Sequence, residues 1–305
     1  MRQISKKQPP HYWRNILLFA LVASLVGFLF LQYVAHPYLL AKAHAHPHRQ
    51  PLCCQTPADY DLEFEEVSFE TADGLTLDGW YVPSENGSAV LLLHGIGSTR
   101  VMMLGLGAGL ARAGYGVLLL DLRAHGTSEG DVLPFGGPEA EDVHAAVAYL
   151  QSRPEVDPDS IGALGWSLGA QTAIFGATAD SDLKAVVADG PGATTFADWP
   201  PPETVDEWLY VPFDFMYYQF LPYHTGVAEP LALVGALPLM GERPLLLISS
   251  GEEIEQHRME YFMGYATEPK ELWVIPEAGH IGGWKTEPEA YEARVIGFFD
   301  QALLP

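Results

Sequence analysis

Cysteine is nearly absent from this sequence of 305 residues, and the two that occur, Cys53 and Cys54, are adjacent. Adjacent cysteines pair with each other only in strained geometry, so they cannot staple distant parts of a fold. Lipidation, pairing with another chain and two unused thiols are all open for them. No C-x-x-C spacing occurs, which leaves no thiolate zinc motif.

Basic residues are also scarce, with 16 lysines and arginines against 39 acidic residues and a net charge of -23. An acidic surface repels phosphate backbones, so nucleic acid is excluded as a partner, and the same charge favours solubility. With 48% apolar and 18% charged residues, the chain is neither disordered nor a polytopic membrane protein.

Charge is missing altogether from residues 16–35. A helix of that length rises about 30 Å, the thickness of the hydrocarbon core of a bilayer. Tyr12, Trp13 and Tyr33 flank it, as aromatic residues do at membrane interfaces. A cleaved signal peptide has a shorter apolar region, and a buried core helix shows polar positions at helical spacing. The sequence therefore predicts a transmembrane helix over 16–35.

Basic residues are unevenly distributed around this run: Arg2, Lys6, Lys7 and Arg14 precede it, whereas Lys42 and Arg49 follow it. The positive-inside rule then predicts cytoplasmic residues 1–15 and places the rest of a single-pass protein on the extracytoplasmic side.

Histidines and prolines crowd residues 36–57, with His36, His44, His46 and His48 among them. Alternating histidines can bind a metal, but no carboxylate or thiolate cage accompanies them here. We expect a solvated, proline-stiffened stalk.

Residues 58–305 alternate between short apolar runs and helical patterns. Runs 63–70 and 75–82 flank the turn residues Asp73 and Gly74 and predict a hairpin. Residues 101–113 and 138–152 have helical spacing, and six apolar runs predict buried strands: 89–93, 116–121, 160–165, 183–189, 245–250 and 271–276. The pattern predicts one α/β domain with an open, doubly wound, mostly parallel sheet and reactive loops at the carboxyl ends of the strands.

The stretch from about 192 to 226 interrupts this alternation and is rich in aromatic residues and prolines. A plain loop of that length would be unusual. We expect a cap insertion that supplies an apolar wall for substrate.

The pentapeptide G-W-S-L-G at 165–169 follows a predicted strand and opens a predicted helix. A sharp strand-to-helix turn of this kind lifts a serine hydroxyl above the sheet. Ser167 is therefore the predicted nucleophile. His280, just beyond the last predicted strand, is its predicted base, because a hydroxyl attacks only when a base takes its proton.

Two backbone N–H groups are needed to hold the oxyanion of a tetrahedral intermediate. Leu168 follows the nucleophile and is expected to supply one. The loop H-G-I-G at 94–97 is expected to supply the other through Ile96.

These motifs, with D-L-R-A-H-G-T-S-E-G at 121–130 and A-G-H at 278–280, make the chain resemble the α/β-hydrolase superfamily, in particular its lipase-, esterase- and serine-aminopeptidase-like branch. The resemblance spans residues 60–305. It implies a structural role for His125 and a glycine where this chain has Ala124.

The resemblance also implies an acid about three residues after Gly251, a position that holds Ile254. Glutamate can orient an imidazole as aspartate does. We rank Glu253 first, then Glu255, then Glu252, and keep Asp189 in reserve because some relatives take the acid from that strand.

The sequence thus predicts a membrane-anchored serine hydrolase that cleaves an apolar ester or related acyl bond, with peptidase and thioesterase as alternative activities. A membrane-tethered, non-catalytic binding or scaffold protein is the alternative from another class. Gly105, Gly107 and Gly109 lie in a helical stretch and lack dinucleotide-loop spacing, so no cofactor and no metal are expected.

Overall fold

The computed structural model describes residues 11–178, 181–227 and 231–304. Its centre is an eight-stranded sheet in the order β1-β2-β4-β3-β5-β6-β7-β8. Strand β2 runs antiparallel to β1 and β4, and the other neighbours are parallel, which confirms the predicted sheet. The strands are β1 (Glu65–Glu70), β2 (Thr76–Val82), β3 (Ala89–Leu93), β4 (Gly116–Leu120), β5 (Ile161–Trp166), β6 (Ala185–Asp189), β7 (Leu245–Ser250) and β8 (Lys270–Ile275).

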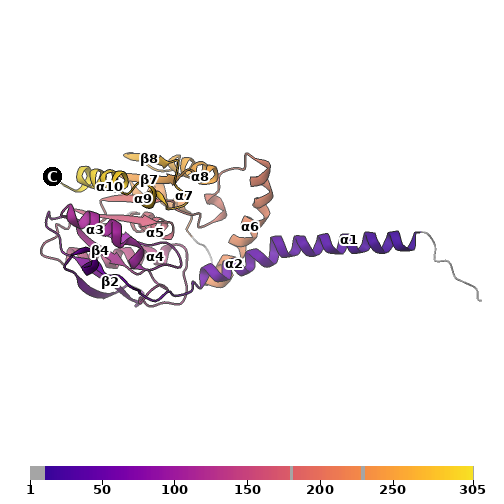
Figure 1. The fold of residues 1–305 in the computed structure, drawn as a ribbon, viewed down its shortest axis with the longest axis horizontal. Helices are drawn as coiled ribbons and strands as arrows, with labels where there is room; N and C mark the ends of the chain where they lie inside the picture. The colour runs from indigo at the N-terminus through magenta and orange to yellow at the C-terminus, as the bar shows by residue number, and fades with distance from the viewer. Residues whose placement is uncertain (1–10, 179–180, 228–230, 305) are drawn as a thin grey trace, which may run out of the picture.

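Helices cover both faces of the sheet (Figure 1). The central strands are apolar throughout because successive side chains enter opposite cores: Leu91 and Leu93 of β3 face one cluster, and Val90 and Leu92 face the other. One core includes residues of α4 (Gly137–Gln151), α5 (Leu168–Gly176), α7 (Leu233–Ala236) and α8 (Glu253–Met263), and the other includes residues of α3 (Leu104–Arg112) and α10 (Pro288–Leu303). The short helix α9 (Gly283–Thr286) precedes α10.

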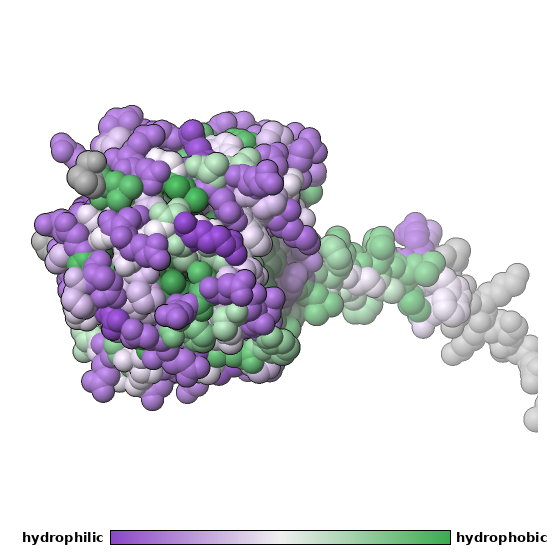
Figure 2. All heavy atoms as spheres, turned by 60° about the vertical axis from the view of Figure 1, so that its left-hand side comes forward, coloured by the Kyte–Doolittle hydropathy of each residue, from purple (hydrophilic) through white to green (hydrophobic). Residues whose placement is uncertain are grey.

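The N-terminal apolar run is helical and projects from the globular part (Figure 1). It comprises α1 (Tyr12–Phe30), the π-helical turn η1 (Leu31–Ala35) and α2 (His36–Ala45), which together form a helix long and apolar enough to cross a membrane. In Figure 2 this helix is apolar along its length, whereas the visible face of the globular part is largely hydrophilic.

The segment predicted to be a solvated stalk, 36–57, is packed on the globular part over its first ten residues, whereas most residues of 46–56 are exposed. Helix α2 packs along α6 (Val205–Thr225) and buries Pro37, Ala41 and Ala45. Alanines four residues apart share one helix face, and their small side chains let α6 approach closely. Beyond α2, the Leu133 N–H donates to the Ala45 carbonyl at 2.8 Å.

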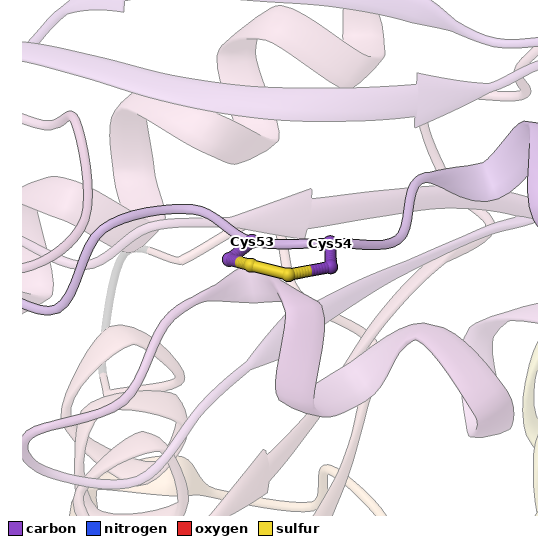
Figure 3. The surroundings of a disulfide bond; sticks show 2 residues. All are labelled: Cys53 and Cys54. Carbon is purple, nitrogen blue, oxygen red and sulfur yellow. A yellow bond between two sulfur atoms is a disulfide. The ribbon is translucent and has the colours of Figure 1, made fainter.

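Cys53 and Cys54 form a disulfide with each other (Figure 3). The sequence left the use of these thiols open, and the structure joins neighbouring residues rather than distant segments. The bond therefore adds no long-range staple to the fold.

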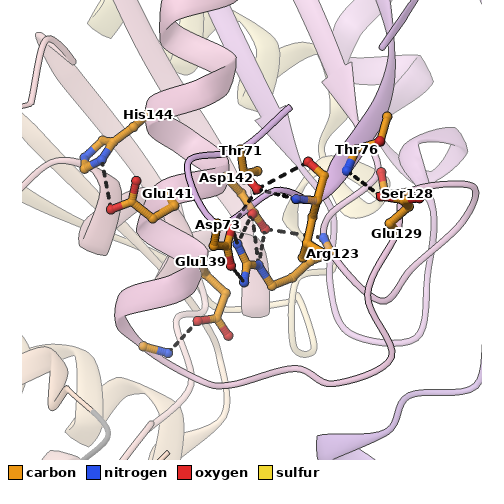
Figure 4. Close-up of polar contacts among 12 residues, drawn as sticks. Thr71, Asp73, Thr76, Arg123, Ser128, Glu129, Glu139, Glu141, Asp142 and His144 are labelled. Atoms are coloured by element: carbon orange, nitrogen blue, oxygen red, sulfur yellow. Dashed lines mark hydrogen bonds and ion pairs between the residues drawn. The ribbon is translucent and has the colours of Figure 1, made fainter. Parts of the chain in front are cut away.

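A buried ion-pair network fixes the turn that follows β4 (Figure 4). The Arg123 guanidinium is bound by Asp142 of α4 at 2.6 Å and by Asp73 of the β1–β2 turn at 2.9 Å. Arg49, from the second half of the predicted stalk, donates to the carbonyls of His125 and Gly126 in the same turn, at 3.2 and 3.1 Å. Contacts from α4, from the β1–β2 turn and from Arg49 thus hold this turn in place.

Candidate active site

Ser167 stands on the sharp turn between β5 and α5. Its backbone lies at φ 53 and ψ -109, a region that L-residues rarely adopt. The Ser167 N–H donates to the Asp189 carbonyl of the neighbouring strand at 2.8 Å, which ties the turn to the sheet. The strained turn presents the hydroxyl at the carboxyl end of the strands, where two other candidate residues also lie.

The glycines on either side of Ser167 are required by close backbone packing. A Cβ atom on Gly165 would lie 2.0 Å from the Gly169 carbonyl oxygen, and one on Gly169 would lie 2.1 Å from the Leu93 carbonyl oxygen. Real Cβ atoms do not approach so closely, so any side chain at either position would push the strand and helix apart.

The predicted base meets the predicted nucleophile. His280 Nε2 lies 3.0 Å from Ser167 Oγ, although the two residues are 113 positions apart in the chain. His280 Nδ1 lies 2.6 Å from a Glu255 carboxylate oxygen. Since a carboxylate only accepts, Nδ1 carries the proton and Nε2 is free to accept from the serine hydroxyl.

The carboxylate within hydrogen-bond distance of His280 is that of Glu255, the second-ranked candidate, and not that of Glu253, the first-ranked one. Helix α8 begins at Glu253, so Glu252 and Glu253 are exposed on its first turn. Two residues further on, about half a turn of helix, Glu255 lies on the buried face, which Met259 and Phe262 continue at helical spacing. That 255–259–262 spacing is the signal in the sequence that could have identified the residue.

Glu255 is held as an ionised acceptor. Burial raises its pKa, but the hydrogen bonds from His280 and from the Ser250 N–H, the latter at 2.7 Å, lower it further than burial raises it. The net result is a lowered pKa, so the carboxylate stays charged beside the imidazole.

Asp189, the reserve candidate, is turned to a different partner. Its carboxyl accepts from the Tyr291 hydroxyl at 2.8 Å, and that hydroxyl accepts from the Trp166 indole at 3.1 Å. Burial raises the pKa of Asp189 to about 7. Among the described residues Asp189 makes no hydrogen bond to His280; its hydrogen bond links β6 to Tyr291 of α10.

The two predicted oxyanion residues lie on either side of the serine. Ile96 and Leu168 line one cavity with Ser167, of about 220 Å³. Within the described part of the chain, neither backbone N–H has a protein acceptor. Free N–H groups beside a nucleophile are available to a developing oxyanion, and Leu168 also opens helix α5.

Two buried histidines hold the loop that carries Ile96. His94 Nδ1 lies 2.8 Å from the Gly95 carbonyl, and its Nε2 accepts from the Leu122 N–H at 3.2 Å. His125 Nδ1 lies 2.8 Å from the Arg123 carbonyl, and its Nε2 accepts from the Gly97 N–H at 3.0 Å. Each ring therefore must be neutral, with the proton on Nδ1, and burial lowers both pKa values to about 4.

This arrangement predicts a pH dependence of stability for His125. In the unfolded chain His125 has a pKa near 6.5, whereas in the folded protein its pKa is about 4. Between these two pH values the unfolded state therefore binds a proton that the folded state does not. Wild-type stability should therefore fall relative to His125→Leu as the pH drops from about 6.5 to about 4, by up to ~1.4 kcal/mol per pH unit. Urea unfolding of both proteins across this range measures the difference.

The stability of the wild type is compared with that of His125→Leu because buried acids change the free energy of unfolding with pH in the opposite direction. The pKa values of Glu139 and Asp189 are raised to about 7 by burial, so they favour the folded state as the pH falls. Their effect is common to both proteins and cancels in the difference. Parallel stability curves for the two proteins would contradict the neutral state assigned to His125.

The cavity at Ser167 has a wall that sequence reasoning did not anticipate. Leu40 and His44 of α2 line it, together with Phe213 and Tyr217 of α6. His44 Nδ1 lies 2.8 Å from the Tyr217 hydroxyl, which joins the two helices at the cavity. No local pattern could have revealed this, because the contact depends on how the N-terminal helix docks on the cap. In the described ranges, no cluster of three potential metal ligands occurs.

Comparison with known proteins agrees with this fold. The Alpha/beta hydrolase family model matches residues 90–294. An uncharacterized protein of Mycobacterium tuberculosis (H37Rv) is 31% identical over 76% of this chain and 75% of its own length. The Pyrococcus furiosus esterase Pf2001 superposes with a TM-score of 0.68 at 28% identity, over 85% of this chain and 98% of that chain.

The match to a thiohydrolase of Aspergillus aculeatus, aneE, is shorter: it is 35% identical over 44% of this chain and 43% of that protein. Because the family model matches residues 90–294, the chain belongs to the alpha/beta hydrolase family. Its esterase and thiohydrolase relatives support a hydrolase activity.

Proposed function

We propose that the protein is a serine hydrolase that cleaves a carboxylic ester or related acyl bond through an acyl-enzyme on Ser167. The observation that carries the proposal is the continuous hydrogen-bond chain from Ser167 through His280 to Glu255, with separations of 3.0 and 2.6 Å. A nucleophile, a base and an orienting acid in this order are what acyl transfer requires.

In the proposed reaction, Ser167 Oγ attacks the substrate carbonyl carbon and its proton passes to His280 Nε2. The oxyanion is stabilised by the N–H groups of Leu168 and Ile96. The imidazolium, stabilised by Glu255, gives the proton to the leaving alcohol or thiol, and the acyl group remains on Oγ. Water then attacks with His280 as base, releases the acid and restores the serine.

An apolar substrate is supported by the cavity lining, in which Leu40, Phe135, Phe213 and Tyr218 are prominent. The esterase and thiohydrolase relatives favour an oxygen ester or thioester over a peptide. A peptidase would also need to bind an extended backbone, and no observation favours that activity.

The decisive experiment is labelling with a fluorophosphonate, which reacts with activated serines. We expect the adduct on the peptide that contains Ser167, together with turnover of a short-chain ester. A non-catalytic scaffold with this fold would give no adduct and no turnover, and that result would reject the proposal.

Leu40 offers a test of the substrate cavity. Leu40→Trp adds a large side chain to a cavity of about 220 Å³, so it should reduce kcat/KM for long-chain esters while leaving an acetyl ester nearly unaffected. A series of p-nitrophenyl esters of increasing chain length measures this, with Leu39→Trp, at an exposed neighbouring position, as the control. Equal effects on all chain lengths would contradict the assignment of α2 as a wall.

We also propose that residues 16–35 anchor the protein in a membrane, with residues 1–15 in the cytoplasm and the hydrolase domain, 58–305, outside. The apolar helix of 34 residues and the basic residues before it support this topology. Protease added to intact, wall-free cells should digest the hydrolase domain; protection until the cells are lysed would reverse the orientation.

A further inference from the structure

Largely exposed apolar side chains gather on the outer face of the first half of α6. Val205, Trp208 and Leu209 are 76%, 62% and 57% exposed, and Pro212 and Phe215 continue the row on exposed positions. The spacing of three, four, seven and ten residues places them on one stripe of the helix. A helix of a folded domain normally turns such a stripe inward, so this one calls for a partner.

The fold places this stripe beside the apolar N-terminal helix. In Figure 1, α6 forms the end of the globular part from which α1 emerges. The Tyr33 hydroxyl, in the turn between α1 and α2, donates to the Leu209 carbonyl at 3.2 Å. The rings of His36 and Phe213 meet edge to face at 5.0 Å. These contacts place the first half of α6 beside Tyr33, at the same position along the axis of the N-terminal helix.

That position is the surface of the bilayer if residues 16–35 span it. Tyr33 lies near the end of the span, where tyrosine and tryptophan prefer to sit among the lipid headgroups. Trp208 and Leu209 then lie at the same depth, with the apolar stripe available to the upper acyl chains. Acidic Glu203 and Asp206 beside the stripe disfavour anionic lipid, so the matching surface is zwitterionic.

Directly behind the stripe is a second cavity, of about 320 Å³. Its walls are mainly aromatic and include Phe196, Trp199, Trp208, Tyr210 and Tyr261. Asp214 lines both this cavity and the one that contains Ser167. The aromatic cavity and the cavity at Ser167 therefore adjoin each other at Asp214.

We propose that the first half of α6 rests in the headgroup layer of the membrane that α1 crosses, and that the aromatic cavity behind it receives the apolar chain of a membrane-resident ester. The proposal rests on the proposed function in two respects, since it supplies the substrate class for the same serine and takes residues 16–35 as the membrane anchor. The contact surface itself is independent of catalysis.

The surface is tested with the full chain in phosphatidylcholine vesicles. Brominated phosphatidylcholine quenches tryptophans that lie in the bilayer. We expect Trp208→Phe to remove part of the quenchable fluorescence, whereas Trp273→Phe, in strand β8 on the globular part, removes none. If the quenchable fluorescence is unchanged in Trp208→Phe, the proposed membrane contact is wrong.

Substrate delivery is tested with a matched pair of leucines. Leu209 and Leu239 are 57% and 50% exposed, but Leu239 lies just before β7, at the opposite edge of the sheet from Ser167. Leu209→Glu should reduce hydrolysis of a long-chain ester carried in the vesicles by about tenfold, and Leu239→Glu should not. Both variants should hydrolyse a soluble short-chain ester at the wild-type rate, because neither residue lines a cavity.

These results separate the two proposals. Equal activity of both variants on the vesicle-borne ester would overturn the delivery route while leaving the hydrolase proposal intact. If the wild-type protein hydrolyses neither ester, the hydrolase proposal fails, and the fluorescence of Trp208 still decides whether α6 touches the membrane.

Discussion

Ser167→Ala is expected to reduce ester turnover by about 10⁵- to 10⁶-fold, the loss typical when the nucleophile of a serine hydrolase is removed. The hydroxyl at 3.0 Å from His280 is the group that would form the acyl bond, and no other described hydroxyl has a hydrogen bond to that imidazole. Steady-state hydrolysis of a short-chain ester measures the loss, and the fluorophosphonate adduct should disappear with it.

The fold should survive this substitution. Alanine keeps the Cβ atom and leaves the Ser167 N–H bonded to the Asp189 carbonyl, so only one side-chain hydrogen bond is lost. Ser160→Ala is the matched control, because Ser160 precedes the same strand at its other end and donates to the Leu303 carbonyl at 3.0 Å. Equal thermal unfolding with turnover lost only in Ser167→Ala is the expected pattern. Turnover in both variants would mean that another residue is the nucleophile.

The sheet could be predicted because buried parallel strands are continuous apolar runs. Each predicted strand lies within two residues of an observed one, and Ala89–Leu93 and Leu245–Ser250 coincide with the prediction. The prediction of Ser167 and His280 rests on the same reasoning, since Ser167 directly follows β5, His280 lies in the loop after β8, and the carboxyl ends of parallel strands share one edge of the sheet. Their meeting is therefore a consequence of topology.

The remaining features depend on information that local patterns do not carry. The first residue of α8 determines which carboxylate faces inward. A run of acidic residues does not mark where a helix begins, so the sequence alone does not distinguish Glu255 from Glu253. The docking of α2 on α6 depends on contacts between segments far apart in the chain, such as that of His44 with Tyr217, which are 173 positions apart. The histidines and prolines of this segment suggested solvent exposure, whereas Ala41 and Ala45 are the residues that decide its packing.

Glu255→Gln is expected to lower kcat by about 10⁴-fold, by analogy with replacing the acid of a Ser-His-Asp triad by its amide. The Ser250 N–H, which now donates to one carboxylate oxygen, would hold the amide oxygen of the glutamine in place. The amide NH₂ would then face His280 Nδ1, which could only accept from it. The imidazole proton would move to Nε2, so the ring could no longer take a proton from Ser167.

Two controls make this prediction specific to the geometry. Glu253→Gln changes the net charge by the same amount on the same helix, but Glu253 is exposed, so its activity should match the wild type. Asp189→Asn should keep most of the activity as well, because the Tyr291 hydroxyl can still donate to the amide oxygen. A large loss in either control with Glu255→Gln active would transfer the role of the acid to that residue. If all three variants stay active, His280 works without an orienting carboxylate, and the 2.6 Å contact with Glu255 has no role in catalysis.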